Sequence, residues 1–344
     1  MGKKIVLGLS GGVDSAAAAS LLKARGLEVL GVWLDLGLGS PEAARENAKK
    51  LGIGFQVFPA REAHEALVRA PFARAYLSGE TPNPCAVCNP TVKLPSLVRA
   101  AEAWGAEKIA TGHYAAVEAH GGRPCLRRSG GDKDQSYMLA LVGPELLGRL
   151  ELPLSGLTKP QIRDLARASS LPAAEARDSQ DICFIPDGDY GSWLEARGDA
   201  LPPGDFTDGA GRVLGRHRGL HRYTVGQRRG LGVSAGSRLY VCALDPAENR
   251  VILGPEAELL TDRLYIKDIH WGAMAPAEGP FSCDVKTRSR PTLHPAQVLP
   301  HGEGLELRFP TPLRRTAPGQ LAVGYDEEGF VLFAGTVTKE GAGR

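Results

Sequence analysis

Short apolar runs alternate with longer amphipathic segments through the first half of the chain. The apolar runs at residues 4–9, 29–34, 55–58 and 108–111 predict buried strands. The segments at residues 15–25, 41–51, 61–77 and 93–103 have helical spacing, while the prolines of residues 81–84 predict a loop. Strands that alternate with helices in this way predict an α/β fold with a doubly wound parallel sheet.

The pattern changes near residue 186. Residues 186–208 are rich in Gly, Pro and Asp and predict a linker, and beyond residue 213 short β-like runs replace the helical spacing. These runs lie at residues 239–244, 251–253, 264–269, 281–285, 305–309, 321–325 and 330–336, and they predict a C-terminal β-barrel-like domain. We therefore expect a sheet domain over residues 1–190, a small central domain over 191–258 and the β domain over 259–344.

The composition is that of an ordinary globular protein. The 344 residues are 43% hydrophobic and 23% charged, and a chain of this length favours two or three domains. The net charge of +2 does not by itself indicate a nucleic-acid partner. No secretory signal and no apolar run of about 18 residues is visible, so we expect a cytoplasmic protein without a membrane span. In a reducing compartment, the six cysteines favour metal binding or catalysis over structural disulfides.

A glycine-rich turn follows the first predicted strand and opens a helix. Its sequence is Ser10-Gly11-Gly12-Val13-Asp14-Ser15, and a helix N-terminus with nearby backbone N–H groups binds anions. Asp14 would hold Mg²⁺ against the phosphates. The lysine of a Walker A loop is absent, which favours cleavage between the α- and β-phosphates. The alternative is a tight strand-to-helix turn with a serine cap.

The same six residues resemble the PP-loop of the ATP pyrophosphatases, whose domain has the adenine nucleotide alpha hydrolase-like fold. In that superfamily the loop binds the pyrophosphate of ATP while an oxygen of the substrate takes the AMP. The resemblance implies that this chain adenylates a substrate.

Two cysteine motifs point to one family within this superfamily. The first is Thr81-Pro82-Asn83-Pro84-Cys85-Ala86-Val87-Cys88-Asn89, and the second is Asp178-Ser179-Gln180-Asp181-Ile182-Cys183-Phe184-Ile185. The stretches 111–114, 133–137, 221–231 and 317–320 add further motifs in the same order. Together they resemble the tRNA 2-thiouridylases, sulfurtransferases that thiolate the wobble uridine of certain tRNAs, and the likeness covers nearly the whole chain.

The resemblance implies roles for individual residues. Cys88 matches the catalytic nucleophile, and Cys183 matches the cysteine that carries the incoming persulfide. ATP would be bound by Gly8, Leu9, Ser10, Gly11, Gly12, Val13, Asp14, Ser15, Leu34 and Gly112. The tRNA would be contacted by Asn83, Pro84, Cys85, His113, Lys133, Asp134, Gln135, Arg288, Ser289 and Gln320. The partners would be tRNA and a sulfur-donor protein, either a cysteine desulfurase or a sulfur-relay carrier.

The implied reaction is chemically consistent. The C2 oxygen of uracil is a poor leaving group, and adenylation converts it into AMP, a good one. One cysteine delivers sulfur as a persulfide while the other attacks it, and the disulfide that remains is reduced afterwards.

Several alternatives stay open at this point. Cys85 stands where the family often has Asp, and Cys85, Cys88 and Cys183 together would suffice for three irons of a [4Fe–4S] cluster. A structural zinc at the CxxC pair lacks two further ligands in sequence. Ser289 replaces a residue that tends to be Tyr in the family. Instead of contacting tRNA, residues 133–135 could equally form the start of a helix. The alternatives to tRNA thiolation are an amide-forming synthetase and a non-catalytic RNA-binding protein.

Basic residues gather in two places. Residues 212–229 hold six arginines and two histidines without an acidic residue, and Lys286, Arg288, Arg290, Arg314 and Arg315 form a second group. Arginines suit RNA phosphates, which favours a tRNA surface over a solvated charged face.

Overall fold

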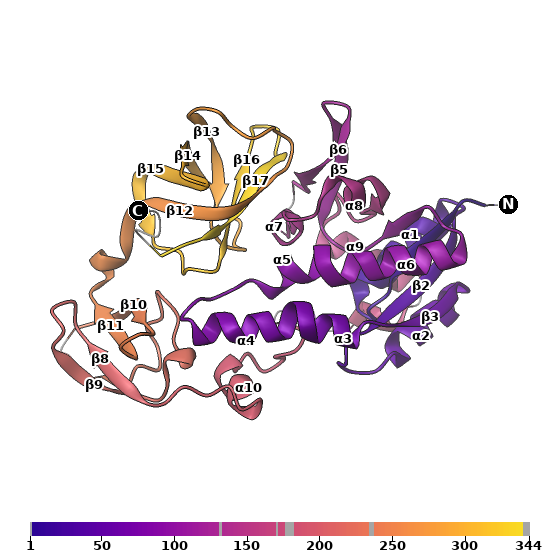
Figure 1. Ribbon diagram of the computed structural model, residues 1–344. Coiled ribbons are helices and arrows are strands. Elements are labelled where there is room, and N and C mark those ends of the chain that lie inside the picture. The colour runs from indigo at the N-terminus through magenta and orange to yellow at the C-terminus, as the bar shows by residue number, and fades with distance from the viewer. Residues whose placement is uncertain (1, 131–132, 170, 176–181, 234–236, 340–344) are drawn as a thin grey trace.

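The computed structural model describes residues 2–130, 133–169, 171–175, 182–233 and 237–339, and Figure 1 shows three bodies joined by long connections. The N-terminal body holds a five-stranded parallel sheet with the order β3-β2-β1-β4-β7. Its strands are β1 (Lys4–Gly8), β2 (Glu28–Asp35), β3 (Gly54–Pro59), β4 (Lys108–Ala110) and β7 (Leu150–Glu151). The predicted α/β fold with a parallel sheet is therefore confirmed.

Helices cover both faces of this sheet. They include α1 (Val13–Ala24), α2 (Glu42–Leu51), α6 (Leu94–Trp104) and α9 (Lys159–Ala168). Successive side chains of a strand point to opposite faces. Val6 of β1 accordingly packs in the cluster that contains Leu97 of α6, whereas Ile5 and Leu7 pack in the cluster that contains Ala16 of α1. The alternation in β1 thus produces two separate cores and a doubly wound sheet.

Two long helical rods extend from the sheet towards the other bodies (Figure 1). The first comprises α3 (Arg61–His64), a π-helical turn (Glu65–Arg69) and α4 (Ala70–Leu77), so the helix predicted at residues 61–77 is confirmed. The second comprises α5 (Pro84–Cys88), another π-helical turn (Asn89–Lys93) and α6. The loop predicted over residues 81–84 therefore ends one residue early, because Pro84 opens α5 and the Asn83 side chain caps it.

The region between residues 112 and 208 contains more regular structure than the sequence indicated. It forms a hairpin of β5 (Ala115–His120) and β6 (Arg123–Arg128), then α7 (Ser136–Leu139), α8 (Pro144–Arg149), a 3-10 turn (Pro172–Glu175), α10 (Tyr190–Ala196) and β8 (Gly204–Thr207). The linker predicted at residues 186–208 was wrong for α10 and β8. Helix α10 forms because Asp189 caps it and Leu194 is buried beside Phe72.

The remaining strands build the two β bodies. A four-stranded sheet with the order β10-β11-β8-β9 adds β9 (Val213–His217), β10 (Tyr240–Asp245) and β11 (Arg250–Gly254). The C-terminal body is a closed barrel of β12 (Leu260–Trp271), β13 (Phe281–Lys286), β14 (His294–His301), β15 (Gly304–Arg314), β16 (Leu321–Tyr325) and β17 (Val331–Val337). The predicted C-terminal β-barrel is confirmed. Short 3-10 turns lie at Leu220–Arg222 and Glu256–Leu259.

Two of the contacts between the barrel and the sheet domain involve residues predicted to contact tRNA. Nζ of Lys286 lies 3.2 Å from Oδ2 of Asp134, with side chains only 1% and 4% exposed. Nε2 of Gln320 donates to the carbonyl of Thr81 at 2.6 Å, just before the cysteine helix α5. The barrel thereby supports the residues that precede both the first cysteine pair and α7. Within the described ranges, none of the helices combines the length and apolarity that crossing a bilayer requires.

Candidate active site

The carboxyl ends of three parallel strands meet in one crevice. Strand β1 lies between β2 and β4, so the chain turns in opposite directions after neighbouring strands. Such a switch point is the usual ligand site of an open α/β sheet. The loop of residues 10–15 follows β1, Leu34 lies at the end of β2, and Gly112 follows β4. The structure thus brings together the residues predicted to bind ATP.

The loop has the conformation of an anion cradle. Ser10 and Ser15 join their hydroxyl groups at 3.1 Å, and the Ser15 hydroxyl donates to the Gly12 carbonyl at 3.0 Å. Gly12 is the N-cap of α1 without a side-chain cap, which leaves first-turn N–H groups directed at the crevice. A Cβ on Gly112 would lie 2.9 Å from the backbone of Asp14 and Ser15. A larger residue there would displace the loop.

Asp14 is held by two side chains that the sequence reasoning missed. Nζ of Lys159 lies 2.7 Å from Oδ1 of Asp14, and the hydroxyl of Tyr114 donates to the same oxygen. Lys159 comes from the start of α9 and Tyr114 from the segment after β4. A carboxylate that is 34% exposed beside a phosphate loop fits Mg²⁺, which needs only one or two carboxylates when phosphates supply the rest.

Cys88 and the neighbours of Cys183 in sequence pack in one hydrophobic cluster. Cys88 ends α5 and is only 7% exposed, packed with Phe72, Phe184 and Ile185. Cys183 directly precedes Phe184 and is exposed. The rings of Phe72 and Phe184 meet edge-on at 5.3 Å. About 95 residues of chain separate the cysteines, and this aromatic packing brings their segments together without tRNA. Residues 178–181 of the second cysteine motif lie outside the described residues.

The surroundings of the cysteines oppose ionisation. Burial raises the pKa of Cys88 to about 11, Lys93 counteracts that rise, and negative charge on Cys183 or Cys85 adds to it. Desolvation also raises the pKa of Cys183, again with Cys85 adding and Lys93 opposing. Burial first and Lys93 second hold the pKa of His113 well below its ordinary value.

Lys93 therefore acts on both thiols and on His113, although the sequence reasoning did not single it out. It ends the π-helical turn that begins directly after Cys88. Such turns often occur at functional sites. A search for a lysine one π-helical turn after Cys88 would have found Lys93 in the sequence.

The cysteines do not form a metal site in the part of the chain that the structure describes. All six cysteines are free thiols, and no three His, Cys, Asp or Glu side chains of the described residues converge as ligands. A [4Fe–4S] cluster requires converging thiolates. Among the described residues, Cys85, Cys88 and Cys183 are not found as such a ligand group, although their charges act on one another, so the structure does not show the cluster. The predicted catalytic disulfide is likewise not formed in this state.

The residues predicted to contact tRNA occupy two kinds of position. Ser289 and Lys133 are exposed, while Asn83 caps α5. Asp134 differs, because its carboxylate accepts from the N–H groups of Ser129 and Ser136 besides the Lys286 contact. Asp134 thus lies just before α7, which begins at Ser136, and its contact with tRNA stays a prediction.

Four of the other predicted tRNA residues also have partners within the protein. The side-chain oxygen of Gln135 accepts from the N–H of Tyr114, and Nδ1 of His113 lies 2.8 Å from the Thr111 hydroxyl. Arg288 donates to the Arg315 carbonyl at 2.9 Å. Together with the Gln320 contact, these bonds hold the four side chains on other parts of the protein.

Acidic neighbours neutralise part of the positive charge of the first basic group, residues 212–229. Arg212 pairs with Asp208 at 3.1 Å and Arg216 with Asp205 at 2.8 Å. Both histidines, His217 and His221, are buried. Arg222 pairs with Glu195. The exposed arginines at positions 218, 228 and 229 remain the better candidates for RNA phosphates.

The second basic group is also partly paired, because Lys286 contacts Asp134 and Arg314 pairs with Glu256. Burial lowers the pKa of Arg288, and the nearby Arg290 and Arg314 lower it further. Arg290 is exposed at the edge of the barrel. Like charges that crowd in this way attract phosphates.

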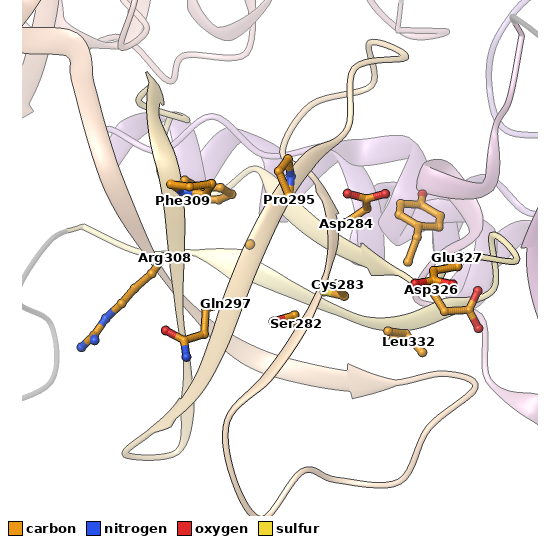
Figure 2. Close-up of a pocket in the computed structure, with 13 residues that line it drawn as sticks. Ser282, Cys283, Asp284, Pro295, Gln297, Arg308, Phe309, Asp326, Glu327 and Leu332 are labelled. Carbon is orange, nitrogen blue, oxygen red and sulfur yellow. The ribbon is translucent and has the colours of Figure 1, made fainter.

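A cavity of about 620 Å³ lies in the barrel and not at the cysteines. Figure 2 shows Asp284, Asp326 and Glu327 around it, with Cys283 and Leu332 nearby. The carboxylates would repel RNA or ATP phosphates. The strand ends with their phosphate loop are therefore the better candidate for the reaction site.

Comparisons with known proteins find matches over nearly the whole chain. Three family models match in succession: a tRNA methyl transferase HUP domain at residues 3–187, a tRNA methyl transferase PRC-barrel domain at 193–255 and an aminomethyltransferase beta-barrel domain at 261–337. A tRNA-specific 2-thiouridylase MnmA of Roseiflexus castenholzii is 41% identical over 96% of this chain and 98% of its own length. Proteins of the same name are 42% identical in Chloroflexus aggregans, over 94% and 95%, and 43% identical in Acidithiobacillus ferrooxidans, over 95% and 96%.

Proposed function

Because the chain belongs to the tRNA-specific 2-thiouridylase family, we propose that it replaces the C2 oxygen of a wobble uridine in tRNA with sulfur at the expense of ATP. It is a sulfurtransferase with an ATP-using HUP domain. The observation that supports the site is the packing of Cys88 and the Cys183 segment in one cluster.

The first half of the reaction takes place at the loop of residues 10–15. The uridine C2 oxygen attacks the α-phosphorus of ATP, the α–β bridging bond breaks, and pyrophosphate leaves. The N–H groups at the start of α1 face the negative charge that builds on the leaving group. Mg²⁺, when bound at Asp14, would neutralise phosphate charge. Leu34 and Gly112 would line the adenosine side.

The second half transfers sulfur between the cysteines. The terminal sulfur of a persulfide on Cys183 attacks C2. The Cys88 thiolate then attacks Sγ of Cys183, the S–S bond breaks, and AMP leaves with the former C2 oxygen. The product is 2-thiouridine, and the Cys88–Cys183 disulfide that remains is reduced by two electrons from a thiol reductant. Burial raises the pKa of Cys88, which disfavours the thiolate that this step uses.

The exposure of Cys183 supports a protein as sulfur donor. A persulfide must be passed from another thiol by direct contact, so the acceptor has to be accessible, and Cys183 is exposed while Cys88 is buried. A cysteine desulfurase or a sulfur-relay carrier has this chemistry. Reduction of the disulfide after each turnover further requires a reducing compartment, which the cytoplasm provides.

The tRNA would lie across all three bodies. We place its target base beside α5 at Asn83, Pro84 and Cys85, opposite His113. Its backbone would contact the exposed arginines of the central domain, which we assign to residues 191–258. Lys133 and Gln135 would add contacts near α7, and Arg288, Ser289 and Gln320 would add contacts from the barrel. Asp134 would serve by positioning its neighbours, since it is buried.

The test is product formation from unmodified tRNA. The protein is incubated with tRNA, ATP, Mg²⁺ and a persulfide donor, and nucleosides are analysed for 2-thiouridine. Wild type is expected to form product, whereas Cys88→Ser is not. Cys125→Ser, at a buried thiol of β6, is the matched control with normal product. Equal product from wild type and Cys88→Ser would overturn the assigned role, and amide formation from ammonia would favour a synthetase.

A further inference from the structure

The phosphate loop lacks a cation of its own. Residues 10–15 contain no lysine or arginine, whereas pyrophosphate gains negative charge as it leaves. In a Walker A loop, a lysine within the loop meets the phosphates. A loop of the present kind needs positive charge from elsewhere in the fold, because fixed cations directed at developing charge are a main source of rate enhancement.

Lys159 is built into the structure at that place. It is the first residue of α9, whose start is fixed by a capping box in which the Thr158 N–H and hydroxyl both donate to the Gln161 side chain. Helix α9 packs against α1, since Ile162 shares a core with Ala16. A rigid support therefore carries the lysine, and only 13% of its side chain is exposed.

The position of Lys159 is electrostatically unusual. A positive side chain at the first residue of a helix opposes the helix dipole, so acidic residues are preferred there. The ammonium group is instead stabilised by Asp14 at 2.7 Å and lies 5.9 Å from the ring centre of Tyr114. The start of α9 thus faces the start of α1 across one carboxylate.

We infer that Lys159 is the phosphate-binding lysine of this site and that Asp14 holds it in place until ATP arrives. When ATP binds, the ammonium moves from Asp14 to the β- and γ-phosphates. Asp14 then becomes available to Mg²⁺, while the Tyr114 hydroxyl keeps the carboxylate in position. This inference rests on the proposed use of ATP and adds a residue for which neither the loop motif nor the resemblance gave a role.

The inference predicts a selective loss of phosphate binding. Lys159→Met removes the charge and keeps the length of the side chain. Binding of ATP, pyrophosphate and AMP is measured by calorimetry on the full chain without Mg²⁺ or tRNA. ATP and pyrophosphate should bind roughly 10- to 100-fold more weakly, because a hydrogen bond to a charged group is lost. AMP lacks both outer phosphates and should change less than about twofold.

Two further variants complete the test. Lys159→Arg keeps the charge and should retain most ATP binding. Lys23→Met removes an exposed lysine of α1 that donates to the Leu51 carbonyl, away from the loop, and should leave the binding of all three ligands unchanged. If Lys159 serves only to hold α9 on α1, Lys159→Met will lower the melting temperature and change ATP and AMP binding equally, which would overturn the inference.

Asp14→Asn tests the exchange of partners. Without Mg²⁺, this variant should bind ATP several-fold more tightly than wild type, because Lys159 is released and one negative charge is removed. The tightening of ATP binding by Mg²⁺ should disappear. Weaker Mg²⁺-free binding would contradict the exchange. These readouts do not involve tRNA, so a failure of thiolation in wild type would overturn the proposed function and leave the lysine assignment standing.

Discussion

The burial of Cys88 limits its reactivity before tRNA binds. Its pKa of about 11 lies roughly two units above the ordinary thiol value of 9.0, so near pH 8 the thiolate fraction is about 100-fold smaller than that of a free thiol. A more basic thiolate is intrinsically more nucleophilic, and a Brønsted slope of about 0.45 restores roughly tenfold. The net expectation is alkylation about tenfold slower than that of a peptide thiol, and the 7% exposure of Cys88 slows it further.

The assay is a time course with isotope-coded iodoacetamide, followed by tandem mass spectrometry that separates Cys85 from Cys88. The Cys88 rate should rise about tenfold per pH unit from pH 7 to pH 10 without a plateau, because the thiolate fraction keeps increasing below the pKa. Cys183 should react sooner, since it is exposed. A Cys88 rate equal to that of a peptide thiol, or a plateau below about pH 9, would refute the reasoning.

Lys93 provides the matched perturbation. Lys93→Met removes the cation that lowers the pKa of Cys88, so alkylation of Cys88 should become slower still. Lys108→Met removes an exposed lysine that donates to the Gly148 carbonyl, away from the thiols, and should leave the rate unchanged. Faster alkylation in Lys93→Met would show that the lysine restricts access to the thiol and does not promote its ionisation.

Three further changes test the frame of the site. Lys286→Met leaves a buried carboxylate unpaired and should lower the free energy of unfolding by about 3–5 kcal/mol, measured in urea; an unchanged midpoint would contradict the buried pair. Gly112→Ala pushes a methyl group against the loop backbone and should weaken ATP binding at least about tenfold in calorimetry, while tRNA binding stays normal. Replacing Arg228 and Arg229 with Ala should reduce the slope of log affinity for tRNA against log salt by about 1.4–1.8, whereas Arg212→Ala should change it less because its guanidinium already has a carboxylate partner.

The features that could be predicted from sequence are local ones. The alternation of apolar runs and helices predicted the parallel sheet, and the glycine-rich turn predicted the phosphate loop, because each depends on residues close together in the chain. The barrel was also predicted from short runs between turns. Its strand β14 escaped detection, since Pro295 and Pro300 lie within it and proline is rare in strands.

The features that could not be predicted depend on contacts between distant segments. Lys159 reaches Asp14 across 145 positions, and no local pattern pairs them. The basic stretch after residue 211 contains no acidic residue, yet Asp205, Asp208 and Glu195 pair with its arginines from outside. The absence of acidic residues within the stretch therefore led us to expect more unpaired positive charge on that surface than the structure has. The sequence also could not show that Cys88 is buried, because the aromatic side chains that cover it come from three separate segments.

The barrel belongs to the frame of the active site as well as to the tRNA surface. Its Gln320 holds the Thr81 carbonyl ahead of α5, and its Lys286 holds Asp134. Gln135, the residue after Asp134, donates its N–H to the Tyr114 carbonyl and accepts from the Tyr114 N–H with its side chain. The Tyr114 hydroxyl in turn donates to Asp14. The barrel thus contacts the segment before the cysteine helix directly, through Gln320 and Thr81. It reaches the ATP loop through three successive contacts: Lys286 with Asp134, Gln135 with Tyr114, and Tyr114 with Asp14. Because tRNA would touch the barrel beside these contacts, a shift of the barrel on tRNA binding would move the supports of Cys88 and of Asp14 together.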